Sequence, residues 1–118
     1  MINCKPLAHL KHIEIGQIIQ AMHCYRDNLK LSESCVFDIS FKNILNNHCL
    51  AKMDGMQMKS IIDALNWRAM KLMYLGEYER FIYYRCLSGK IVSSLKVFQE
   101  VNGPKINKNA VCTPIQTA

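Results

Sequence analysis

The segment that decides the fold is Asp54–Gly76, which reads DGMQMKSIIDALNWRAMKLMYLG. Asp54 is followed three residues later by Gln57, and this spacing is a capping box that marks the start of a helix. Apolar residues then recur at intervals of three and four, the period of one helix face: Met58, Ile61, Ile62 and Leu65. We expect a helix from here to about Arg68, with further apolar residues up to a stop at Gly76.

Helical patterns also lie on both sides of this segment. An N-terminal helix is predicted from Pro6 to about Leu31, on an apolar stripe of Leu7, Leu10, Ile15, Ile18, Ile19, Met22 and Tyr25. Gly16 lies within this predicted helix, where it either lowers the stability of the helix or allows another helix to approach closely. A C-terminal helix is predicted over 77–100, with Ser88-Gly89 as a candidate break and an apolar face of Leu87, Ile91, Leu95 and Phe98.

The stretch between the first two helices is ambiguous. Cys35–Leu45 (CVFDISFKNIL) fits a short buried strand or a helix face, and we favour one or two short helices that end at a turn at Asn46-Asn47. The sequence therefore predicts an all-α fold: a small helical domain over 1–104 with long N- and C-terminal helices. Residues 105–118 form a polar tail that we expect to be mobile.

Composition limits the class of protein. Half of the 118 residues are hydrophobic and a fifth are charged, which is typical of a globular domain. No apolar run reaches the roughly 18 residues of a membrane span, and the N-terminus lacks the apolar region of a signal peptide, so we expect a cytoplasmic protein without membrane contact. The net charge of +6 is spread along the chain, and it favours nucleic-acid contact only if a folded surface gathers it. A domain of this size has a thin core, and its long apolar helix faces lead us to expect a homodimer.

The residues that usually carry chemistry do not form a known pattern. Six cysteines are present, with no Cys-x-x-Cys pair: Cys4, Cys24, Cys35, Cys49, Cys86 and Cys112. We interpret them as reduced thiols that form neither disulfides nor a zinc site. His9 and His12 are a weak metal signal, since no carboxylate or thiolate lies near them in sequence. Without a phosphate-binding loop or a nucleophile motif, we expect no enzyme activity, cofactor or metal; a thiol or metal enzyme built on the cysteines is the rival hypothesis.

The sequence favours a binding function over a catalytic one. Aromatic and basic residues alternate over 74–85, which suits a protein interface or nucleic acid, although one side of this cluster could equally be core. Our candidates for phosphate contact lie on the C-terminal helix: Arg80, Arg85, Lys90 and Lys96. Our candidates for a protein interface come from all three predicted long helices: Ile18, Met22, Met58, Ile62, Trp67 and Tyr84.

One segment resembles a known family. SGKIVSSLKVFQEVNGP (Ser88–Pro104) is similar to the C-terminal segment of FlhD, the D subunit of the enterobacterial flagellar master regulator, where the pattern is Ile-x-x-Ser-x-Arg-Leu-Leu-Asn-Asp-Val-Asn-x-Pro. Leu7–Ile15 and Leu50–Asn66 resemble two earlier stretches of the family more loosely and in the same order. The family's cysteine for an interchain disulfide falls near Met70 in this chain, so that bridge is not carried over.

The resemblance implies a specific function, whereas the composition alone does not. FlhD-type subunits are all-helical dimers that assemble with a zinc-binding, FlhC-like C subunit, bind DNA upstream of flagellar promoters, activate transcription by recruiting RNA polymerase, and have no metal or catalytic activity of their own. We therefore expect a DNA-binding transcriptional activator subunit for flagellum biogenesis. The alternative is a small helical adaptor or anti-regulator that binds protein and not DNA.

Overall fold

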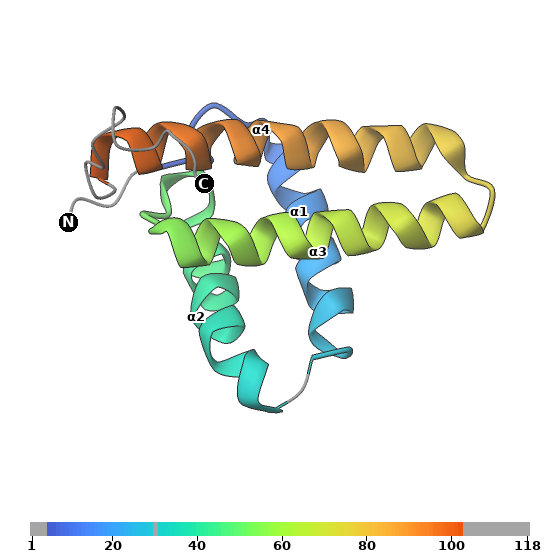
Figure 1. The fold of residues 1–118 in the computed structure, drawn as a ribbon, viewed down its shortest axis with the longest axis horizontal. Helices are drawn as coiled ribbons and strands as arrows, with labels where there is room; N and C mark the ends of the chain where they lie inside the picture. Colours follow the sequence, from blue (N-terminus) through green and yellow to red (C-terminus); the bar gives the residue numbers. More distant parts are fainter. Residues whose placement is uncertain (1–4, 30, 103–118) are drawn as a thin grey trace, which may run out of the picture.

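The computed structural model describes residues 5–29 and 31–102, and in these the fold is all-α as predicted. Figure 1 shows its four helices: α1 (His12–Arg26), α2 (Leu31–Asn47), α3 (Gly55–Tyr74) and α4 (Tyr78–Asn102). A short 3-10 helix, η1 (His48–Leu50), connects α2 to α3. The expected tail over 105–118 lies outside the described residues, and dimer formation stays a prediction.

The central element is α3. It contacts each of the other helices, most extensively α4, with which it forms a long antiparallel hairpin (Figure 1). Its first residue follows Asp54, whose Oδ1 accepts the backbone N–H of Gln57 at 2.9 Å. The Gln57 side chain does not complete the capping box: its Oε1 accepts the side-chain amide of Asn43 at 3.1 Å, which ties α3 to α2. Half of the predicted box therefore forms, and a contact between helices takes the place of the other half.

The end of α3 lies beyond the residue that the sequence predicted. The helix continues from Arg68 to Tyr74, and Gly76, with φ +79°, ends it as expected. In that conformation a Cβ is strained, so glycine is the residue best suited to this turn.

The N-terminal helix is shorter than predicted. Residues 6–10 form turns, and α1 begins at His12, where the Glu14 side chain accepts the backbone N–H of Lys11 at 2.9 Å. Leu7 and Leu10 are nevertheless buried, as the apolar stripe required. The predicted start at Pro6 was wrong because apolar spacing does not distinguish a helix from the compact turn before it.

The two other regions that the sequence left uncertain are both continuous helix. The ambiguous stretch around Cys35–Leu45 belongs to one helix, α2, which ends at Asn47 where the turn was predicted. The last helix passes through Ser88-Gly89 without a break. Gly16 and Gly89 are both exposed, and a Cβ at either would meet no neighbour within 4 Å, so Gly16 does not mark a close helix approach.

The core lies between the hairpin and the two shorter helices. The stripe of α1 and the face of α4 bury the side chains that their spacing predicted, with Ile19, Tyr25 and Leu95 only partly covered. No helix within residues 5–29 and 31–102 is long and apolar enough to cross a membrane.

Candidate functional site: the hairpin tip and one side of α4

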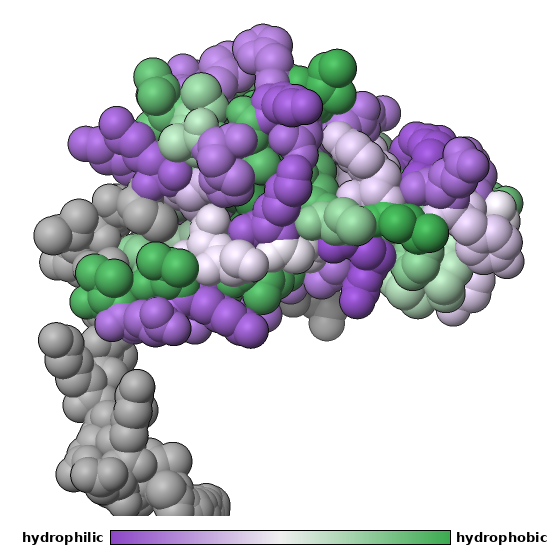
Figure 2. All heavy atoms as spheres, turned by 90° about the horizontal axis from the view of Figure 1, so that it is seen from above, coloured by the Kyte–Doolittle hydropathy of each residue, from purple (hydrophilic) through white to green (hydrophobic). Residues whose placement is uncertain are grey.

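The end of the α3–α4 hairpin extends past α1 and α2, as the yellow turn in Figure 1 shows. Its side chains are large and exposed: Met70 by 40%, Tyr74 by 83%, Leu75 by 70%, Tyr78 by 63% and Ile82 by 57%. We call these five residues the tip patch. Seen from above, hydrophobic and near-neutral side chains reach the surface at this end of the molecule beside strongly hydrophilic ones (Figure 2). A concentration of exposed apolar side chains is common at sites that bind another molecule.

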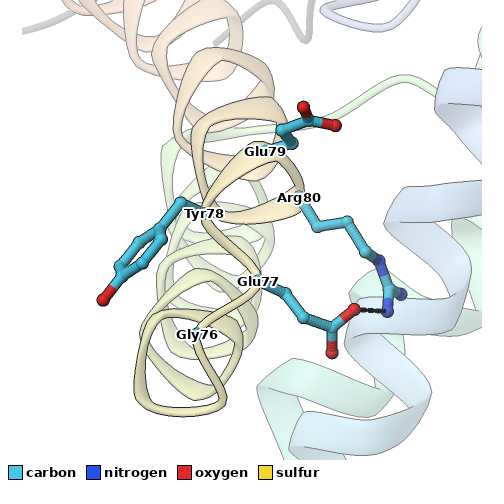
Figure 3. Close-up of a pocket in the computed structure, with 5 residues that line it drawn as sticks. All are labelled: Gly76, Glu77, Tyr78, Glu79 and Arg80. Carbon is cyan, nitrogen blue, oxygen red and sulfur yellow. Dashed lines mark hydrogen bonds and ion pairs between the residues drawn. The ribbon is translucent and has the colours of Figure 1, made fainter.

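Helix geometry explains why the exposed side chains of each helix lie along one face of that helix. Met70 and Tyr74 are four residues apart on α3, and Tyr78 and Ile82 are four apart on α4, so each pair lies along one helix face. The two helices run antiparallel from the turn at Gly76, which brings the pairs to matching heights. Figure 3 shows Tyr78 pointing away from α1 and α2.

The turn itself carries a shallow hollow that is not suited to catalysis. It has a volume of about 330 Å³ and is lined by residues 76–80. The labelled side chains in Figure 3 diverge, with Glu77 and Arg80 joined by an ion pair at 3.1 Å on the side opposite Tyr78. The hydrogen bond from Arg80 to Glu77 raises the pKa of the guanidinium above its ordinary value. Apart from that pair, the lining residues bring no acid and base together.

The four predicted phosphate-contact residues do not form one row along α4. Arg85 and Lys96 are exposed and eleven residues apart, close to three full helical turns, so they share a side. Arg80 is paired with Glu77, and Lys90 donates to Glu14 Oε2 at 2.6 Å. Among the described residues, no ion pair involves Arg85 or Lys96.

Lys90 belongs to a polar contact between α1 and α4. The Glu14 carboxylate accepts the backbone N–H of Lys11 and the ammonium of Lys90, and these hydrogen bonds lower its pKa. One turn further along, the Tyr84 hydroxyl donates to Gln17 Oε1. Lys90 is therefore committed to holding the two helices together, and its charge is already compensated.

The six predicted interface residues divide by burial. Four are in the core of the single chain, with at most 1% of their surface exposed: Ile18, Met22, Met58 and Tyr84. In this packing a partner protein does not reach them, and their contribution is to the stability of the domain. Ile62 and Trp67 are partly exposed; the Trp67 ring lies against Tyr25, with the Lys71 ammonium 5.1 Å from its centre.

The thiols and histidines form no larger cluster where the structure describes them. Cys24, Cys35, Cys49 and Cys86 are free, and Cys4 and Cys112 lie outside the described residues. Within 5–29 and 31–102, no three side chains of His, Cys, Asp or Glu gather closely enough to hold a metal ion.

Sequence reasoning found part of the tip patch and missed the rest. The aromatic and basic cluster over 74–85 included Tyr74 and Tyr78, but Leu75 and Ile82 were not singled out. The signal was present in the spacing: Tyr78, Ile82 and Arg85 recur at helical intervals, out of phase with the buried series of Tyr84 and Leu87.

Comparisons with protein-family models, with curated proteins and with solved structures find no match to this chain. The resemblance to FlhD therefore rests on the quoted residues alone.

Proposed function

We propose that this protein is a non-enzymatic subunit of a DNA-binding transcription activator of the FlhD type. The observation that carries the proposal is the pairing of two features on the hairpin: the apolar tip patch, and the uncompensated cations Arg85 and Lys96. Arg85 follows Tyr78 by seven residues, two helical turns, so the cations lie on the same side of α4 as part of the patch.

Each feature suits one part of that function. Exposed tyrosines next to aliphatic side chains are typical anchors of protein interfaces, so the tip patch is the proposed contact for a partner, either an FlhC-like zinc-binding subunit or a second copy of this chain. Arg85 and Lys96 are the proposed phosphate contacts. Contacts of this kind position a protein on DNA and carry no sequence information themselves.

The remaining parts of the proposal come from the resemblance. The subunit acts in the cytoplasm, without a metal or cofactor of its own, as a homodimer within a larger complex. That complex recruits RNA polymerase at flagellar-type promoters. Two cations per chain are a small electrostatic footprint, so binding to DNA requires the dimer and its partner to add further phosphate contacts.

The DNA part is tested with Arg85→Ala combined with Lys96→Ala. The assembled complex should bind DNA more weakly, and the slope of log affinity against log salt should flatten by roughly one unit per lost contact. A matched control, Lys42→Ala with Lys52→Ala, removes the same charge from exposed positions on α2 and in the connection to α3. Equal affinities of wild type and the Arg85/Lys96 variant across the salt series would exclude this side of α4 as the DNA surface.

The second candidate function is an adaptor that binds protein and not DNA, and the uncharged tip patch favours it. Replacing Tyr74 and Tyr78 with serine should abolish partner binding without changing the helical circular dichroism. If partner binding depends on these tyrosines while no DNA shift occurs at any salt concentration, the protein is the adaptor. If the tyrosine variant binds its partner normally, the tip is not the interface in either function.

A further inference from the structure

Two histidines from distant parts of the chain meet where α1 begins. His12 is the first residue of α1, and His48 opens η1 in the connection between α2 and α3. Their ring centres are 6.2 Å apart, with an angle of 30° between the ring planes. Both side chains are exposed, so solutes reach the pair from solvent.

The separation lies just above the range in which two rings share a metal ion. An ion about 2 Å beyond a ring nitrogen lies roughly 3 Å from the ring centre, so two rings that share one ion have centres up to about 6 Å apart. A small rotation of either exposed side chain therefore brings one nitrogen of each ring to the same ion. Imidazole is a good ligand for nickel, copper and zinc, and water completes the coordination in a site with two protein ligands.

We infer that His12 and His48 form a two-imidazole site for a borderline divalent cation such as Ni²⁺, Cu²⁺ or Zn²⁺. The bound ion links the start of α1 to the α2–α3 connection, two segments that are distant in sequence and pack against each other in the fold. The site is weak and exchangeable: it has two protein ligands where structural zinc has four, and the positive end of the α1 dipole opposes a cation beside His12. The site is a separate property of the chain: the proposed function uses no metal in this subunit and does not depend on this exchangeable ion.

The test measures thermal unfolding of the untagged full chain with increasing Ni²⁺. Nickel is the better probe because the free cysteines, two of them exposed, compete more strongly for zinc. The variants are His12→Gln and His48→Asn; asparagine is chosen because His48 has φ 51°, a conformation that asparagine tolerates. The matched controls are His9→Gln and His23→Gln, which remove other exposed histidines.

Ni²⁺ should raise the melting temperature of the wild type and of both controls, and EDTA should reverse the rise. In His12→Gln and His48→Asn the apparent dissociation constant should increase at least tenfold, while the metal-free melting curves remain cooperative. A nickel response in these two variants equal to that of the controls overturns the site. So does a wild type whose melting temperature does not respond to nickel.

Discussion

The part of the α3–α4 hairpin that other helices cover and its exposed tip use the same kinds of side chain in opposite ways. Leu65 on α3 is fully buried whereas Leu75, directly after α3, is 70% exposed; on α4, Tyr84 is 1% exposed whereas Tyr78 is 63% exposed. The difference is coverage: α1 and α2 pack against the hairpin away from its turn, and the tip extends beyond them (Figure 1). Residue type therefore does not decide what is core in this molecule; the extent of the shorter helices does.

The comparison also separates stability from function. Where α1 and α2 cover the hairpin, buried side chains stabilise the fold. Side chains at the tip stay exposed, so they contribute little to the free energy of unfolding. The proposed function treats these exposed tyrosines and aliphatic residues as a contact surface. Matched substitutions in the two regions test this division directly.

The largest effect is expected from one substitution made in both regions. Leu65→Ala removes a fully buried side chain from the centre of α3 and should lower the free energy of unfolding by about 2–5 kcal/mol. Leu75→Ala changes a residue that is 70% exposed and should alter it by less than about 0.5 kcal/mol. Urea denaturation followed by circular dichroism gives both values.

Similar losses of unfolding free energy in the two leucine variants would contradict the difference between the covered part of the hairpin and its tip. They would mean that the tip is covered in solution, for example by a second copy of the chain. The same measurement at several protein concentrations separates that case, because the stability of a dimer rises with concentration.

The glycines should respond to alanine with opposite signs. Gly16 and Gly89 lie inside helices with open space around a new Cβ, so alanine should stabilise the protein by up to about 1 kcal/mol at each position. Gly76 at the tip has φ +79°, where alanine should cost about 1–2 kcal/mol. Thermal unfolding of the three single variants is sufficient, and a stabilising Gly76→Ala would show that the turn is not fixed in this conformation.

The sequence predicted more of the fold than of the site. Local chemistry was sufficient for the start of α3 after Asp54 and for the turn at Gly76, because caps and glycine turns act within a few residues, although the helix continues past its predicted end near Arg68. The sequence could not show that Lys90 pairs with Glu14, 76 positions away, because this depends on how α1 crosses α4. The different helical phases of Tyr78 and Tyr84 are visible in the sequence, but phase alone does not show which face of α4 the other helices cover.

A smaller effect is expected when a single hydroxyl is removed. Tyr84→Phe leaves the buried ring in place but takes away the hydrogen bond to Gln17, so the free energy of unfolding should fall by about 0.5–1.5 kcal/mol. Tyr78→Phe, at the tip, removes a hydroxyl from a side chain that is 63% exposed and should have no measurable effect on stability. A Tyr84→Phe variant as stable as wild type would mean that the Gln17 contact is replaced by water.

The smallest effect concerns pH and the contact between α1 and α4. The pKa of Glu14 lies below its ordinary value of 4.5, chiefly because the carboxylate accepts the Lys11 backbone N–H and also because it accepts Lys90. A carboxylate with a lowered pKa in the folded state stabilises the protein above its unfolded pKa, and this contribution disappears as pH falls through the folded pKa.

The Glu14→Gln variant tests this contribution, because it retains an acceptor for the Lys11 backbone N–H and removes the charge. We expect the wild type to exceed this variant in stability by a constant amount well above pH 4.5, and the difference to shrink as the pH falls through the folded pKa of Glu14, which lies below 4.5. The difference is small because ion pairs at the surface contribute little. Urea titrations of the two proteins across this range test it, and a difference that persists unchanged in acid would show that the charge of Glu14 does not contribute to holding α1 against α4.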